Sequence, residues 1–173
     1  MFLCYNIRVF KAGVLVISDK GSTGERVDTS GPAAKEILKG LPAEVTHFEI
    51  IPDDKEAIIA TLTEWVDEHT LDIIVTSGGT GLSPRDVTPE ATLEVIEREI
   101  PGLAEAMRMA TMSQNPYSIL SRGICGHRGK CLIINLPGSP GGVRECLGSI
   151  IKSVPHALET LAGKVHEGPH YKG

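Results

Sequence analysis

The sequence predicts an α/β protein with a mostly parallel sheet and helices on both of its faces. Three short runs rich in Val, Ile and Leu have the length and composition of buried strands, at 12–17, 71–76 and 131–136. Segments with apolar residues at helical spacing separate these runs, which gives the alternation of strands and crossovers that parallel sheets require. Glycine loops or aspartates follow the strands, so these loops are expected to converge at one edge of the sheet.

The first half of the chain divides into strand, loop, helix, strand and helix. The first strand is followed by a polar loop without periodicity. A helix is expected to start near Ser30 and to end at Gly40, because Pro32 suits a first helical turn and glycine suits a helix end. A second strand is expected at 45–51, and apolar residues at helical spacing predict a helix that reaches about His69.

The second half begins with the buried run at 71–76 and a glycine loop. Thr88 as N-cap and Pro89 at the first helical position then predict a helix of about three turns to residue 100, which Pro101 and Gly102 are expected to break. The remaining expected elements are a helix at 103–111, a short helix at 117–122, a basic glycine-containing loop at 123–130, a strand at 131–136, a second glycine loop at 137–142, a helix from 143 and a closing helix at 155–161.

Composition limits the class of protein. With 173 residues, 41% hydrophobic and 23% charged, the chain is expected to be a single domain over 1–173, with an extension at 1–8 and a loose tail at 164–173. A net charge of −5 without a basic stripe argues against a nucleic-acid partner, and no apolar run is long enough to span a membrane. The cysteines form no CxxC pair and are expected to be reduced thiols of a cytoplasmic protein: Cys4, Cys125, Cys131 and Cys146.

The stretch LDIIVTSGGTGLSPRDV at 71–87 carries the clearest functional signal. A buried strand runs into three glycines within four positions, whose backbone N–H groups can form an anion-binding concavity. Arg85 and Asp86 follow, and then a helix start. This order of elements is typical of phosphate binding at the carboxyl end of a strand. The alternative is a tight strand-to-helix turn that needs glycine only for its geometry.

The charged residues around this loop favour metal-assisted phosphate chemistry. Asp86 alone would repel a phosphate, but Mg²⁺ could bridge the two, with Asp53 as the second carboxylate. Asp53 could instead cap the helix that follows it in a capping box with Glu56, and Asp54 could exchange roles with it. Arg85 could neutralise transferring phosphate charge or could pair with Asp86 or a neighbouring helix. Ser139 could donate to a second phosphate or could be a turn residue.

Several other chemistries lack support in the sequence. The six histidines are scattered, no Cys/His spacing resembles a zinc site, and no nucleophile and base pair stands out. The G-x-x-x-x-G-K-[ST] motif is missing, and no G-x-G-x-x-G follows the first strand. The residues therefore favour phosphoryl or nucleotidyl transfer by positioning and metal over covalent or acid–base catalysis.

Three stretches together resemble a known family: GVLVISD at 13–19, TSGGTGLSPRDVTPEAT at 76–92 and LIINLPGSP at 132–140. The pattern is similar to the molybdopterin-binding domain of molybdenum cofactor biosynthesis, in its stand-alone bacterial molybdopterin adenylyltransferase form. The resemblance covers about 11–162. The related competence-damage proteins and molybdenum insertases share the glycine loop but vary in the residues after it.

The resemblance implies a three-layer αβα fold, a homotrimer, and conversion of molybdopterin and Mg-ATP to adenylyl-molybdopterin and pyrophosphate, with a molybdenum insertase as downstream partner. It also implies that Asp53, rather than Asp54, and Asp86 are functionally important, and these two would hold Mg²⁺. The ligand contacts that it implies are Ser18, Asp19, Ser77, Gly78, Gly79, Thr80, Gly81, Pro137, Gly138 and Ser139.

Two alternatives remain open on sequence alone. A binding module that carries molybdopterin or the finished cofactor without adenylylating it would have the same loops. A hydrolase of phosphorylated or nucleotide-like pterins is the other alternative, suggested by the competence-damage relatives. Pyrophosphate release that requires both ATP and molybdopterin would distinguish the adenylyltransferase from both.

Overall fold

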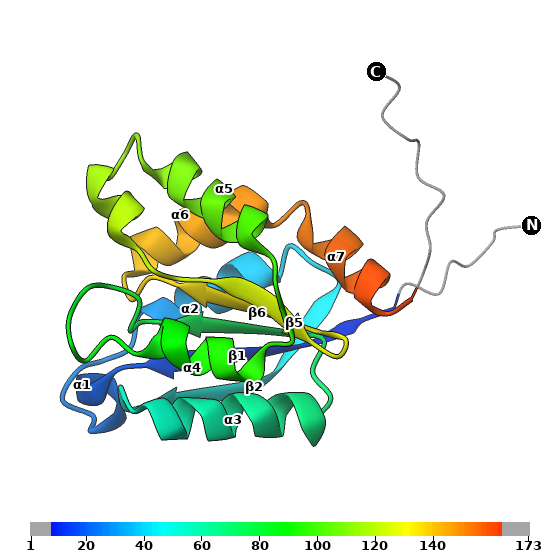
Figure 1. Cartoon of the computed structure of the whole chain (residues 1–173), viewed down its shortest axis with the longest axis horizontal. Coiled ribbons are helices and arrows are strands. Elements are labelled where there is room, and N and C mark those ends of the chain that lie inside the picture. The colour runs from blue at the N-terminus through cyan, green and yellow to red at the C-terminus, as the bar shows by residue number, and fades with distance from the viewer. Residues whose placement is uncertain (1–7, 164–173) are drawn as a thin grey trace, which may run out of the picture.

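The computed structural model describes residues 8–163, which form a six-stranded sheet between two layers of helices (Figure 1). The sheet order is β2-β1-β3-β6-β5-β4. The strands are β1 (Phe10–Ile17), β2 (Ala43–Ile51), β3 (Ile73–Ser77), β4 (Arg98–Glu99), β5 (Cys125–Arg128) and β6 (Cys131–Leu136). β1 pairs in parallel with both β2 and β3, and β3 pairs in parallel with β6, whereas β5 and β4 extend the sheet in antiparallel fashion. The predicted mostly parallel sheet is therefore confirmed.

Helices cover both faces of the sheet, which confirms the three-layer αβα architecture (Figure 1). The helices are α1 (Asp19–Ser22), α2 (Ser30–Leu38), α3 (Lys55–Asp67), α4 (Thr88–Val95), α5 (Pro101–Thr111), the 3-10 helix η1 (Pro116–Leu120), α6 (Pro140–Ile150) and α7 (Val154–Leu161). Helices α3 and α4 share one hydrophobic core, and α2, α5, α6 and α7 share the other.

Alternation along the central strands divides the side chains between these two cores. In β1, Val14 and Val16 belong to the core under α2 and α6, whereas Leu15 and Ile17 belong to the core under α3. Successive strand side chains point to opposite faces, so a strand buried on both faces reads as a continuous apolar run. This explains why the central strands could be recognised from composition.

The antiparallel edge of the sheet was not predicted. The expected loop at 123–130 contains β5, which pairs with β6 and turns at Gly129, a residue with φ +53°. The helix expected to reach residue 100 ends at Val95, because Ile96 takes an extended conformation and the chain enters β4. The Ile100 N–H donates to the Cys125 carbonyl at 2.7 Å, so pairing with β5 replaces the last helical turn.

Several helix ends also differ from the prediction. Thr88 is the first residue of α4 and not its cap, and Pro101 begins α5 where it was expected to break a helix. The short helix α1 occupies the loop that was expected after β1. Asp54 is the N-cap of α3, since its carboxylate accepts from the Ala57 N–H at 2.9 Å. The predicted capping box at Asp53 is therefore wrong.

Two further predictions concern the cysteines and the termini. Cys125, Cys131 and Cys146 are buried free thiols, as expected. Cys4, most of the extension at 1–8 and the tail at 164–173 lie outside the described residues. Among the helices of residues 8–163, none has the length and apolar character needed to cross a membrane.

Candidate active site

The candidate site lies at the carboxyl edge of the parallel strands. From β1 the chain passes outward to β2, whereas from β3 it continues to the strands on the other side, so the strand order reverses between β1 and β3. Open α/β sheets bind ligands at such a switch point. The loops that follow β1, β2, β3 and β6 meet there, and they contain the glycine and aspartate residues that the sequence singled out.

The glycine loop, residues 77–81, has a backbone that requires glycine at two positions. Gly78 has φ +109°, and a Cβ atom there would lie 2.2 Å from the Ile17 carbonyl oxygen. Gly79 has φ +64°, and its Cβ would lie 2.2 Å from Thr88 Oγ1. Both conformations are ones that side-chain-bearing residues rarely adopt. The loop is thus held against β1 on one side and against the start of α4 on the other.

Hydrogen bonds turn the carbonyl groups of this loop toward the protein. The Gly78 carbonyl accepts from Thr88 Oγ1 at 2.9 Å, and the Gly79 carbonyl accepts from the Thr88 N–H at 3.1 Å. Among residues 8–163, the N–H groups of Gly79, Thr80 and Gly81 donate to no protein acceptor. Three consecutive N–H groups without a protein acceptor are suited to binding phosphate oxygens.

Two cavities flank the glycine loop. The larger cavity, of about 630 Å³, extends toward α5, η1 and α6, and the smaller cavity, of about 180 Å³, extends toward α1 and α2. Both are lined in part by Gly78, Gly79 and Gly138. Of the other predicted ligand contacts, Thr80, Gly81, Asp86, Pro137 and Ser139 line the larger cavity, whereas Ser18, Asp53 and Ser77 line the smaller one.

Asp19, Asp53 and Arg85 form one connected group. The Asp19 N–H donates to Asp53 Oδ2 at 2.9 Å, and the Asp53 N–H donates to Asp19 Oδ1 at 3.0 Å. Arg85 donates to both carboxylate oxygens of Asp19 at 2.8 and 2.9 Å. Arg85 thus pairs with Asp19, the first residue of α1, so the sequence alternative of an ion pair with a neighbouring helix is confirmed and the one with Asp86 is not. Asp19 and Arg85 belong to neither cavity lining in the part of the chain that the structure describes.

The surroundings shift the pKa values of the two carboxylates of this group in opposite directions. The hydrogen bonds from Arg85 lower the pKa of Asp19. Burial raises the pKa of Asp53, and the neighbouring charges of Asp19 and Asp86 raise it further. Asp53 therefore gains most from a cation that would offset the negative charge around it.

Asp86 lines the larger cavity, whereas Asp53 lines the smaller one. Asp86 Oδ2 accepts from the Ser83 N–H at 2.8 Å and would lie 2.9 Å from a Cβ at Gly81. Asp53 Oδ1 would lie 3.2 Å from a Cβ at Gly79. The structure therefore brings both predicted metal carboxylates to the glycine loop, one at each cavity.

The donor set fits Mg²⁺ shared with a phosphate. No cluster of three or more His, Cys, Asp or Glu that could hold a metal is found within residues 8–163. The side chains of residues 8–163 therefore do not form a complete metal site by themselves. Mg²⁺ commonly takes one or two carboxylates and completes its six positions with phosphate oxygens and water. Asp53 and Asp86 could supply those carboxylates.

The three predicted serines all have partners within the protein. Ser77 Oγ donates to the Pro137 carbonyl at 3.0 Å, so it joins the loops after β3 and β6. Ser18 Oγ accepts from the Gly21 N–H at 3.1 Å and caps α1, and Ser139 Oγ accepts from the Gly142 N–H at 3.2 Å and caps α6. The hydroxyl protons of Ser18 and Ser139 are not used in those bonds and can be donated to a ligand.

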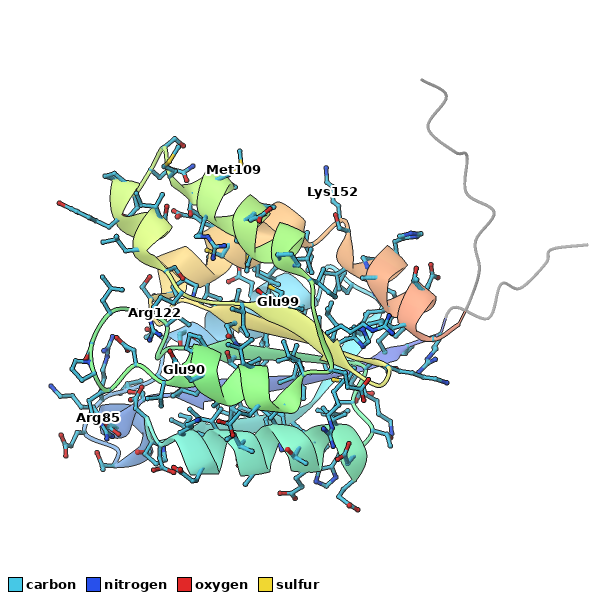
Figure 2. The ribbon with its side chains drawn as sticks, in the orientation of Figure 1. Arg85, Glu90, Glu99, Met109, Arg122 and Lys152 are labelled. Carbon is cyan, nitrogen blue, oxygen red and sulfur yellow. The ribbon has the colours of Figure 1, made fainter. Side chains whose placement is uncertain are left out.

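Arg122 was not singled out from the sequence. Its Nε donates to the Gly81 carbonyl at 2.7 Å, its Nη2 donates to the Asp86 carbonyl at 2.6 Å, and its Nη1 forms an ion pair with Glu90. Figure 2 shows Arg122 and Glu90 next to each other beside the start of α4. The sequence holds no signal for these contacts, since two of the partners are backbone carbonyls about 40 residues earlier in the chain.

Comparison with known proteins identifies relatives of this chain. A family model described as "Probable molybdopterin binding domain" matches residues 13–156. The molybdopterin adenylyltransferase of Helicobacter pylori strain J99 is 43% identical over 154 residues, covering 87% of this chain and 87% of the relative. The molybdopterin adenylyltransferase of Escherichia coli K12 is 39% identical over 173 residues, covering 91% of this chain and 88% of the relative.

A solved structure agrees with these sequence matches. The crystal structure of the molybdopterin biosynthesis enzyme MoaB from Thermus thermophilus superimposes with a TM-score of 0.86 at 51% identity. The match covers 90% of this chain and 98% of that chain. The matched family region, 13–156, includes the glycine loop, both cavity linings and the three aspartates described above.

Proposed function

The chain belongs to the family of probable molybdopterin binding domains, and on that premise we propose that it is a molybdopterin adenylyltransferase of molybdenum cofactor biosynthesis. It would join the phosphate of molybdopterin to the AMP portion of ATP and release pyrophosphate. The observation that carries the proposal is the glycine loop itself. Its three N–H groups without a protein acceptor belong to residues that line the larger cavity, one of which, Gly79, also lines the smaller cavity, and each cavity has its own carboxylate.

Two cavities that share one phosphate-binding loop suit a reaction between two phosphorylated substrates. Each cavity would hold the non-phosphate portion of one substrate, and both phosphates would meet at Gly78 and Gly79. Holding two reactants in line at one place can supply much of the rate enhancement of a transfer reaction. The chain needs no nucleophilic side chain for this chemistry.

The proposed transfer is a displacement at the α-phosphorus of ATP. A phosphate oxygen of molybdopterin forms the new P–O bond, while the bond from the α-phosphorus to the bridging oxygen of pyrophosphate breaks. The attacking phosphate is already ionised at neutral pH, so no strong general base is needed. The N–H groups of Gly79, Thr80 and Gly81 would hold phosphate oxygens and stabilise their charge as the bond order shifts.

Asp53 and Asp86 would hold Mg²⁺, which offsets the charge on pyrophosphate as it leaves. Burial and the charges of Asp19 and Asp86 raise the pKa of Asp53, and a bound cation would favour its ionised form. The Arg85 side chain is 64% exposed, and it could exchange Asp19 for the phosphates of ATP. Ser18 and Ser139, at the starts of α1 and α6, could add hydroxyl donors at the two cavities.

The proposed assembly is a homotrimer in the cytoplasm, with a molybdenum insertase as downstream partner. Four exposed large apolar side chains on α5, at its C-cap and on η1 support self-association, because apolar patches on a surface mark contact sites. This α5–η1 patch consists of Met109, Met112, Tyr117 and Ile119, which are 74%, 51%, 75% and 59% exposed. A reactive adenylylated product also fits a partner that consumes it directly.

The test is pyrophosphate release by the purified protein with Mg-ATP, with and without molybdopterin. Release that requires molybdopterin and is lost in Asp86→Asn would support the adenylyltransferase. Molybdopterin binding without pyrophosphate release would mean a carrier, and release without molybdopterin would mean a hydrolase. Either of those results would overturn the proposal.

A further inference from the structure

The segment between η1 and β5 forms one wall of the larger cavity. Ser121 and Gly123 line that cavity, whereas the side chain of Arg122, which lies between them, reaches the loop that carries Asp86. Nη1 of Arg108, on α5, donates to the carbonyl of Gly123 at 3.1 Å and to that of Ser121 at 3.4 Å. The wall is therefore fixed to α5 on one side and, through Arg122, to the loop that carries Asp86 on the other.

All three nitrogens of the Arg122 guanidinium are used within the protein. Nε and Nη2 hold the carbonyls of Gly81 and Asp86, at 2.7 and 2.6 Å, and Nη1 pairs with Glu90 in the first turn of α4. The Arg122 N–H also donates to the Thr80 carbonyl at 2.9 Å. A planar guanidinium can hold several acceptors in one fixed geometry, which a lysine cannot do.

These contacts enclose the segment from Thr80 to Glu90 and hold it at both ends. The segment includes Ser83 to Asp86, where Asp86 Oδ2 accepts from the Ser83 N–H at 2.8 Å. Glu90 Oε2 is buried without a hydrogen-bond partner among the described residues, and Oε1 of the same carboxylate pairs with Arg122. Removing Arg122 would leave two carbonyls and a carboxylate without their donor.

We propose that Arg122 is a positioning residue for the nucleotidyl transfer: it fixes the place of Asp86 relative to the glycine loop and links that place to the wall of the larger cavity. The inference rests on the proposed function. Arg122 does not touch the reacting atoms, since its donors are occupied by Gly81, Asp86 and Glu90. Its effect is on where Asp86, and any cation it holds, lies when both substrates are bound.

The test compares Arg122→Gln with a matched control, Arg128→Gln. Arg128 pairs with Asp67 and contacts the Val95 carbonyl, and its side chain is 32% exposed against 34% for Arg122. It lines a third cavity, whose residues are not part of the site. We expect Arg122→Gln to lower kcat by about 100-fold with KM for ATP little changed, because small misplacements cost rates of that order. Its half-saturating Mg²⁺ concentration should rise several-fold, and Arg128→Gln should change neither quantity.

Two further variants refine the comparison. Arg122→Lys keeps a positive charge near Glu90 but lacks the planar fork, so it should recover only part of the lost kcat. Full activity in Arg122→Lys would overturn the proposal, as would Arg122→Gln with the kcat and Mg²⁺ dependence of Arg128→Gln. If Arg122→Gln does not fold, Glu90→Gln keeps the shape of that side chain and should show a smaller loss of kcat with the same rise in Mg²⁺ requirement.

A readout that needs no activity separates this inference from the proposed function. Hydrogen exchange of the backbone N–H groups at 81–86 should be faster in Arg122→Gln than in the wild type and unchanged in Arg128→Gln. If the wild type released no pyrophosphate with molybdopterin but this exchange pattern were found, the proposed function would fail while the structural role of Arg122 stood. Equal exchange in all three proteins would overturn the role of Arg122.

Discussion

Asp19 and Asp53 bind each other reciprocally, since the backbone N–H of each donates to the carboxylate of the other at 2.9 and 3.0 Å. The pair joins the loops that follow two adjacent parallel strands, and it fixes the Asp53 carboxylate beside the glycine loop. Asp54, one residue later, caps α3 instead. The two adjacent aspartates therefore have different roles: Asp53 belongs to the candidate site, and Asp54 caps α3.

This division predicts opposite effects for substitutions at neighbouring positions. Asp53→Asn should lower pyrophosphate release by orders of magnitude while the protein stays folded, because the amide cannot hold Mg²⁺ as a carboxylate does. Asp54→Ala should keep its turnover and lose about 1 kcal/mol of unfolding free energy, the usual cost of losing an N-cap. Steady-state kinetics and urea denaturation of both variants check this. Turnover lost in Asp54→Ala but kept in Asp53→Asn would reverse the assignment.

The glycine loop predicts a second matched pair. Gly79→Ala should destabilise the protein by about 2 kcal/mol or more, because φ is +64° and the new Cβ would meet Thr88 Oγ1. Gly148 lies inside α6 with open space around its Cβ position, so Gly148→Ala should stabilise the protein by about 1 kcal/mol. Thermal or urea unfolding measures both changes. A neutral Gly79→Ala would contradict the geometry described for the loop.

The buried thiols predict a loss of stability at alkaline pH. Burial raises the pKa of Cys125 from 9.0 to about 12. Below pH 9 the thiol is protonated in both states, and its contribution to stability is fully present. Above pH 9 the unfolded state ionises first, so stability is lost as the pH rises toward 12, by about 1.4 kcal/mol per pH unit for this thiol.

Urea denaturation between pH 8 and pH 11 tests this prediction in the wild type and in Cys125→Ala. The variant should be less stable at pH 8 because it leaves a cavity, but its stability should fall less steeply with pH. Parallel curves for the two proteins would mean that Cys125 does not contribute to the alkaline transition.

The α5–η1 patch predicts the place of the subunit contact in the proposed homotrimer. Replacing Met109 and Ile119 together by Glu should convert a trimer to monomers, because the charges would have to be buried in the contact. Leu93, on α4, is 50% exposed and serves as the control, since Leu93→Glu should leave the mass unchanged. Figure 2 shows Met109 directed away from the body of the protein on α5. Light scattering of the three proteins gives the masses, and a trimer in the doubly substituted protein would exclude this patch.

The central strands of the sheet could be predicted because strands buried on both faces have an apolar composition. β1, β3 and β6 are mostly apolar and almost entirely buried because both of their faces are covered. β5 has the sequence Cys-Gly-His-Arg, which carries no apolar alternation, and β4 has only two residues. β5 is a strand because it pairs with β6, and β4 is a strand because it pairs with β5. Such pairing between strands leaves no local pattern in the sequence.

The candidate site was predicted only in part, because some of its residues leave a local pattern in the sequence and others do not. Positive φ angles require glycine, so Gly78 and Gly79 marked their loop in the sequence. The partner of Arg85 was not predicted, because Asp19 lies 66 residues away along the chain. Arg122 could not be found at all from sequence, since its partners include two backbone carbonyls and any residue type offers those.

The residues that line both cavities are Gly78, Gly79 and Gly138, and none of them carries a side chain. The outer walls, by contrast, are built of side chains such as Met107, Leu120 and Cys146. In the proposed reaction, side chains of the outer walls would contact the non-phosphate portions of the substrates, whereas backbone N–H groups, with Asp53 and Asp86, would handle the phosphates. Substitutions in the outer wall could retarget the protein to substrates of another size, while the backbone that handles the phosphates would be inherited unchanged.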